Sequence, residues 1–80
     1  MLLADGFAQA FIGVGRRSGQ PDIAVYDQLK CIEILEKRDG MTIDEAEEFF
    51  EFNVVGAWVG EQTPLFLDGK NMDVLLQEME

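Results

Sequence analysis

A helix stop signal and a helix start signal lie two residues apart in the middle of this sequence, and this spacing constrains the fold most. Thr42 followed by Glu45 forms a capping box, in which each side chain can bond the backbone N–H of the other residue. The pattern predicts a helix from Thr42 to about residue 53, with Gly56 available to end it. Gly40 is placed to end a preceding helix, so we expect the two helices to pack as an αα-hairpin.

The preceding helix is predicted over residues 27–39. Asp27 is a suitable N-cap residue, and Leu29, Ile32 and Leu35 recur at helical spacing. Two basic residues in the last turn suit the negative end of the helix dipole. Both helices are short for isolated helices in water, so we expect tertiary contacts to hold them.

The segments on either side of the helix pair have weaker patterns. The N-terminal third fits either two strands at 11–15 and 23–26, joined by a turn at 18–22, or a short helix at 5–12. Downstream, we expect short extended segments at 57–59 and 65–67 and a helix over 72–80. The predicted fold is therefore a compact α+β domain with a central αα-hairpin packed against a few short β-strands.

Length and composition fit a single domain over residues 1–80. Eighty residues leave no room for two hydrophobic cores, and an apolar share of 48% is too high for intrinsic disorder. Cys31 is the only cysteine, so no disulfide within the chain can support the small core.

The charge balance is strongly acidic, with 16 Asp and Glu against six Lys and Arg and a formal net charge of -10. Direct binding to nucleic acid or to an anionic membrane requires Lys and Arg, so the partner that this charge favours is a basic protein surface. The N-terminus lacks a secretory signal pattern, and no apolar run approaches the roughly 20 residues of a membrane span. We therefore expect a cytoplasmic protein without membrane contact.

The residues that usually carry catalysis are missing or isolated. The chain has no His, and Cys31 lies in an apolar helical stripe without a base beside it. Gly13, Gly15 and Gly19 resemble a phosphate-binding loop only faintly, and a tight turn is the preferred interpretation because the known fingerprints are incomplete. The carboxylates at 68–73 lack the spacing of a calcium loop. We predict a protein that is no enzyme and has no catalytic residue, cofactor or metal site.

The clearest pattern with functional meaning is the charge on the helix after Thr42. Carboxylates recur at steps of three and four residues, which places on one helix face the side chains of Asp44, Glu47, Glu48 and Glu51. Successive carboxylates along that face lie roughly 5–6 Å apart, comparable to phosphates on a nucleic-acid strand. Three acidic residues of the preceding helix could extend this surface: Glu33, Glu36 and Asp39. An ordinary solvated helix face is the alternative interpretation.

Aromatic residues near this face are candidate anchors for a partner. Phe49 and Phe50 are predicted to share the core side of the helix with Ala46 and Asn53. Phe52 is therefore expected to point away, towards other elements, a dimer partner or a target. Trp58 is either a core residue or a second anchor, since Trp is enriched in interface hot spots. A small acidic domain with spare aromatic residues can complete its core by pairing, so a homodimer is a further expectation. The candidate partner-binding residues are Asp44, Glu47, Glu48, Glu51, Phe52 and Trp58.

Several runs of residues together resemble a family of small uncharacterised proteins from tailed-phage and prophage genomes. The runs are EKRDGMT at 36–42, EAEEFFEFNVVGAWVGE at 45–61 and TP at 63–64, with GRR, GQP and VYD upstream at 15–17, 19–21 and 25–27. The resemblance covers most of the chain. It implies a phage origin and the bacterial host cytosol as the place of action, and it supplies no catalytic positions.

Charge and resemblance together lead to a hypothesis about function. We expect an acidic protein-binding protein that inhibits a host nucleic-acid-binding or defence complex, by nucleic-acid mimicry or by steric block. The analogy is with anti-CRISPR proteins, which are often of this size and charge. The alternative is a structural, assembly or replication-accessory phage module that acts as a homo-oligomer.

Overall fold

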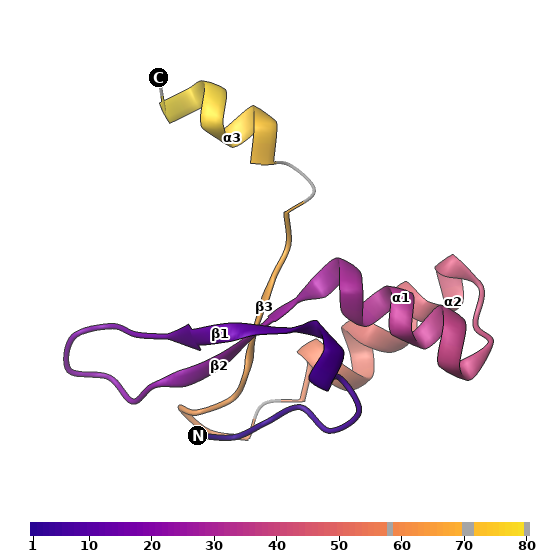
Figure 1. Ribbon diagram of the computed structural model, residues 1–80, viewed down its shortest axis with the longest axis horizontal. Coiled ribbons are helices and arrows are strands. Elements are labelled where there is room, and N and C mark those ends of the chain that lie inside the picture. Colours follow the sequence, from indigo (N-terminus) through magenta and orange to yellow (C-terminus); the bar gives the residue numbers. More distant parts are fainter. Residues whose placement is uncertain (58, 70–71, 80) are drawn as a thin grey trace.

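The computed structural model describes residues 1–57, 59–69 and 72–79 and has the α+β fold that the sequence predicts (Figure 1). A three-stranded sheet in the order β1-β2-β3 is joined to helices that follow the central strand. The elements in chain order are the 3-10 turn η1 (Ala8–Ala10), β1 (Phe11–Gly15), β2 (Ile23–Asp27), α1 (Gln28–Asp39), α2 (Ile43–Phe49), the π-helix η2 (Phe50–Val55), β3 (Leu65–Leu67) and α3 (Met72–Met79).

The sheet combines a local hairpin with a long-range parallel pairing. β1 and β2 pair antiparallel through a turn in which the Gln20 N–H donates to the Arg17 carbonyl at 3.0 Å and Gly19 has a φ of 76°. β3, which follows α1, α2 and η2 in the sequence, pairs parallel with the other edge of β2. The strand interpretation of the N-terminal third is therefore confirmed. The alternative helix at 5–12 is wrong, since only the single turn η1 forms there.

The central strand has one face in the core and one face outside it. Ala24 and Tyr26 are buried, while the alternate residues Ile23 and Val25 are only partly buried. This alternation follows from the two-residue period of a strand, and it means that the helices cover one face of the sheet.

The predicted helix pair is confirmed together with its end signals. Asp27 caps α1, because its Oδ1 accepts from the Leu29 N–H at 3.0 Å, and Gly40 ends α1 in the left-handed region with a φ of 67°. Thr42 and Glu45 form both bonds of the capping box, at 3.2 Å to the Thr42 hydroxyl and 3.0 Å to the Glu45 carboxylate. α1 and α2 pack against each other, as the three-residue connection at 40–42 requires.

The second helix departs from the prediction at its end. α2 stops at Phe49, and the chain continues as the π-helix η2 up to Val55, two residues beyond the predicted end. The wider turn is visible where the Gly56 N–H donates to the Glu51 carbonyl at 3.1 Å. Gly56 has a φ of -72°, so it follows the helix in a right-handed conformation and supplies no left-handed cap.

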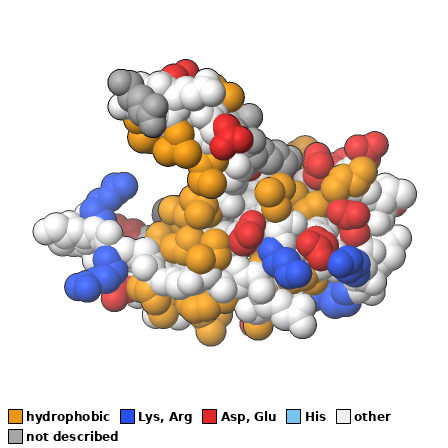
Figure 2. Space-filling view, turned by 45° about the horizontal axis from the view of Figure 1, so that its top comes forward, with side chains coloured by type: hydrophobic (Ala, Val, Ile, Leu, Met, Phe, Trp, Pro, Cys, Tyr) orange, Lys and Arg blue, Asp and Glu red, His pale blue; other side chains and the backbone are white. Residues whose placement is uncertain are grey.

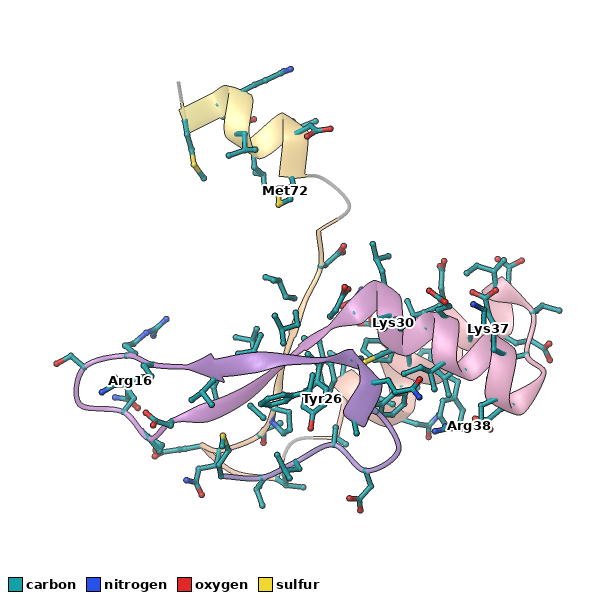
Figure 3. All side chains as sticks on the ribbon, in the orientation of Figure 1. Arg16, Tyr26, Lys30, Lys37, Arg38 and Met72 are labelled. Carbon is teal, nitrogen blue, oxygen red and sulfur yellow. The ribbon has the colours of Figure 1, made fainter. Side chains whose placement is uncertain are left out.

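The core is built around an aromatic cluster between the helices and the sheet. The Phe50 ring meets the rings of Phe7 and Phe66 edge-on, with centroids 6.5 and 5.0 Å apart. The Tyr26 ring lies beside Phe66, with the ring centroids 5.7 Å apart, and is labelled between the sheet and the helices in Figure 3. Cys31 and other apolar residues of α1 close this core from the helix side. Offset and edge-on ring pairs add to the stability that burial alone provides.

The C-terminal part is more open than the rest. α3 forms nearly over its predicted span, but it stands apart from the sheet and the helix pair, and none of its residues is buried (Figure 1). Of the two extended segments predicted downstream, the one at 65–67 forms β3. Ala57 and Val59 lie outside helices and strands, and Trp58 lies outside the described residues. Within the described ranges, no helix is long and apolar enough to cross a membrane.

Candidate protein-binding surface

The predicted acidic residues of the second helix come together around one shallow hollow. The capping box fixes the start of α2, and the helical steps then direct successive carboxylates to one side. A hollow of about 420 Å³ is lined by Asp44, Glu47, Glu48, Glu51, Phe52, Phe50, Gln28 and Ile32. Every charged residue in this lining is acidic. The first five residues are called the acidic–aromatic surface below.

Phe52 is the most exposed aromatic side chain in the described residues, with 73% of its surface accessible. Phe50, two positions earlier, is 1% exposed, so the chain directs one ring into the core and the other to solvent within a single turn. Phe52 also borders a second hollow of about 400 Å³, which Glu48 shares. The Phe52 ring therefore lies between the two hollows. This exposed position suits a residue that anchors a partner protein.

The prediction of which residues in this helix face the core is partly wrong. Ala46 and Phe50 are buried, but Phe49 is 39% exposed and Asn53 is exposed as well. α2 buries a narrow stripe because it packs mainly on α1, and the π-turn after Phe49 then changes the helical period. The apolar edge of Phe49 consequently adds to the surface beside Phe52, where both rings line the second hollow.

None of the three acidic residues of α1 lines the hollow of the acidic–aromatic surface, and two of them, Glu33 and Asp39, are bound by basic residues of the same helix. The Lys37 ammonium contacts Glu33 Oε1 at 2.6 Å and the Lys30 ammonium lies 3.4 Å from it. These bonds hold the pKa of Glu33 below its ordinary value, with the Lys37 hydrogen bond as the largest cause. Asp39 is bound in the same way by the neighbouring Arg38 at 3.0 Å. The charge of α1 is thus largely balanced within α1.

Sequence reasoning missed a hollow beside α1 that is lined by three basic residues and by Glu33. Lys30, Lys37 and Arg38 line a depression of about 580 Å³ together with the η1 segment, and Figure 3 shows the three side chains along this helix. The Arg38 guanidinium donates to the Gly6 carbonyl at 2.7 Å and lies 5.6 Å from the centre of the Phe7 ring. Arg38 therefore has a structural role, because it fastens the N-terminal segment to α1. The spacing from Lys30 to Lys37 was a visible sign of a common helix face.

The residues considered for catalysis or metal binding are either buried in the core or paired with a neighbouring side chain. Cys31 is fully buried, and burial followed by the nearby Asp27 charge raises the pKa of its thiol to about 11. The thiol is therefore protonated at neutral pH and unsuited to act as a nucleophile. Arg16 pairs with Asp22 at 3.7 Å within the hairpin turn. Among the residues that the structure describes, no cluster of three carboxylate or thiol groups could hold a metal ion.

Trp58, the sixth predicted contact residue, lies outside the described residues, so the acidic–aromatic surface is defined without it. Figure 2 shows many acidic side chains over the helical end of the molecule, with the basic side chains of α1 lying among them, and a further basic group at the hairpin tip. Comparison with protein-family models, with curated proteins and with solved structures gave no match.

Proposed function

We propose that this chain is a phage-encoded acidic binding protein whose acidic–aromatic surface docks on a basic surface of a host protein or nucleoprotein complex. The observation that carries the proposal is the Phe52 ring, which is 73% exposed and borders a hollow that four carboxylates also line. An exposed Phe within a charged rim is a usual arrangement for a protein-binding anchor, because the ring gains from burial and the rim selects the partner.

The carboxylates and the ring have different tasks in this proposal. The carboxylates Asp44, Glu48 and Glu51 steer the protein towards a basic site and set the correct orientation. Phe52 supplies the apolar contact that slows dissociation, since a charged rim contributes more to association rate than to affinity. The basic charges of α1 are held in ion pairs within that helix, so they oppose this attraction only weakly.

The proposed partner class is a basic site that normally holds nucleic acid. Carboxylates on one helix face recur roughly every 5–6 Å, a spacing similar to that of phosphates along a strand. Occupation of such a site would inhibit the host complex, either by mimicry or by steric block. The resemblance to small phage and prophage proteins supports a bacterial nucleoprotein complex, such as a defence complex, as the target, and the host cytosol as the location.

The test is affinity capture from nuclease-treated bacterial lysate with matched variants. The double variant Glu48→Lys and Glu51→Lys, and separately Phe52→Ala, should lose the captured partner. A control with the same change in net charge, Asp5→Lys and Glu61→Lys, should retain it, since both control residues are exposed and lie outside the surface. Retention of the partner, or of inhibition of its activity, by the Glu48 and Glu51 variant would show that the proposal is wrong.

A structural or assembly role as a homo-oligomer is the second candidate function. The observation that favours it is the exposed apolar face of α3, which the acidic–aromatic surface does not include. Tolerance to the charge reversals separates the two candidates, because assembly through α3 should survive Glu48→Lys with Glu51→Lys, whereas binding of a basic partner should not.

A further inference from the structure

One face of the sheet is apolar although the helices pack on the other face. Ile23 and Val25, which alternate with buried Ala24 and Tyr26, lie on this side, and cross-strand pairing aligns Val25 with Leu65. Asp27, which pairs with Leu67, is engaged at the end of the strand as the N-cap of α1. Leu65 and Leu67 are 44% and 54% exposed. We call this the open sheet face and define it by Ile23, Val25, Leu65 and Leu67.

β1 adds a flat edge to the open sheet face. Gly13 pairs with Val25 and Gly15 with Ile23, so glycines stand where this face would otherwise carry side chains. A Cβ atom at Gly15 would lie 3.0 Å from the Val25 side chain, whereas one at Gly13 would meet nothing within 4 Å. The bare backbone at Gly13 therefore lets another element approach the sheet closely.

α3 has a matching apolar face. Its eight residues place on one side Met72, Leu75, Leu76 and Met79, which are 51% to 78% exposed. Figure 2 shows apolar side chains on this helix and along the strand that leads to it. A two-turn helix is too short to be stable in water alone, so α3 requires a surface on which to pack.

The combined area suits a stable dimer. The open sheet face and the apolar face of α3 together provide eight partly exposed side chains, which offer on the order of 500 Å² of apolar area per chain. Apolar atoms make up about 60% of an ordinary interface, so this area corresponds to roughly 800 Å² per partner. That is the size of a standard specific interface.

Charge complementarity also favours a second copy of this chain. Arg16 and Arg17 of the hairpin line a hollow of about 300 Å³ together with Ile23 and Leu65 of the open sheet face, and the two Arg residues outnumber the one acidic residue in this lining, Glu61. The Arg16 side chain is 82% exposed, and its contact with Asp22 is long, at 3.7 Å. The apolar face of α3 is flanked by acidic residues on both sides, Asp73 and Glu78.

We propose that the open sheet face binds α3 of a second copy, in a two-fold exchange in which each chain gives its helix and receives the other. Both halves of the contact are present in every chain, which is the condition for an isologous interface. The acidic–aromatic surface lies on the helix side of the sheet, so it stays exposed and the repulsion between two acidic chains is reduced by distance. The inference does not depend on the proposed function.

Sedimentation equilibrium of the full chain tests the proposal. The wild-type protein should have about twice the 9.0 kDa monomer mass at tens of micromolar. Leu76→Glu should sediment as a monomer, because it places a charge on the apolar face of α3. Val74→Glu is the matched control: the residue is 56% exposed against 51% for Leu76, lies on the opposite side of α3, and should remain dimeric.

Two further measurements complete the design. Circular dichroism should show that Leu76→Glu keeps the helix pair and the sheet and loses only the helical signal of α3, since α3 contributes no buried residue to the core and no longer has a surface on which to pack. Arg16→Glu with Arg17→Glu should raise the dimer dissociation constant several-fold, as expected for exposed ion pairs. A monomeric wild-type chain, with α3 folded on its own sheet or awaiting a foreign partner, would overturn the proposal, and so would a dimeric Leu76→Glu variant.

Discussion

The hydroxyl oxygen of Tyr26 accepts a hydrogen bond from the backbone N–H of Ala4 at 2.9 Å, across 22 positions of the chain. This bond connects the N-terminal segment to the central strand, and the Tyr26 ring keeps its contacts with Phe11 and Phe66. We predict that Tyr26→Phe lowers the free energy of unfolding by about 1 kcal/mol, because the ring remains and one partly buried bond is lost. Urea unfolding measures the loss, and amide exchange at Ala4 should accelerate. An unchanged urea midpoint would contradict this role.

Truncation to alanine should lower the stability much more at Phe50 than at Phe52. Phe50→Ala should cost about 3–5 kcal/mol, since its ring is 1% exposed and meets two other rings. Phe52→Ala should change the free energy of unfolding by no more than about 0.5 kcal/mol, because the ring is largely in solvent. Thermal unfolding of the pair is the measurement. A large loss for Phe52→Ala would mean that the ring packs within the chain.

The capping box offers a separate test of the helix pair. Thr42→Ala removes the hydroxyl that accepts from the Glu45 N–H, and it should lower the free energy of unfolding by about 1 kcal/mol. Thr42→Ser keeps the hydroxyl and is the control, with a much smaller loss expected. Equal losses for both variants would assign the effect to the lost methyl group instead of the cap.

The local signals explain which parts of the fold could be predicted from sequence. Asp27, Gly40 and Thr42 act on backbone groups within four residues, so their roles follow from spacing alone. The parallel pairing of β2 with β3 could not be predicted, because it depends on packing between distant segments. The π-helix could not be predicted either, and the interpretation of Phe49 as a core residue failed with it.

The candidate surface was only partly visible in the sequence. The α2 carboxylates and the outward direction of Phe52 follow from helical spacing. The sequence also indicated that Glu33 would not join this surface, because Lys37 lies four residues after it and forms the ion pair that such spacing favours. The hollow around Arg38 depends on its bond to Gly6, 32 positions away, and such a contact leaves no local sign.

The buried thiol should react slowly in the folded protein. A rise of the Cys31 pKa to about 11 lowers the thiolate fraction at pH 8 roughly 100-fold, and burial blocks access as well. Labelling with a chromogenic disulfide reagent should therefore be at least about 100-fold slower than for the same chain in urea. Similar rates in both conditions would show that α1 opens readily.

The carboxylate of Glu45 should contribute to stability in a pH-dependent way. The backbone hydrogen bond from Thr42 holds the pKa of Glu45 below its ordinary value, so the ionised form is favoured by folding. Its contribution is therefore present above the unfolded pKa and disappears as the pH falls through the folded pKa. The stability difference between wild type and Glu45→Gln should shrink as the pH is lowered from about 6 to about 3. A difference that stays constant over this range would contradict the assignment.

The parallel pairing of Val25 with Leu65 has a consequence for the order of folding. The β1–β2 hairpin and the helix pair are made from neighbouring segments and can form early, whereas the third strand arrives forty positions after its partner. Until then the central strand has one unpaired edge, and the rings of Tyr26 and Phe50 lack their common neighbour Phe66. A growing chain thus stays open to wrong pairing until residue 67 is made, and the same late step closes both the sheet and the aromatic core.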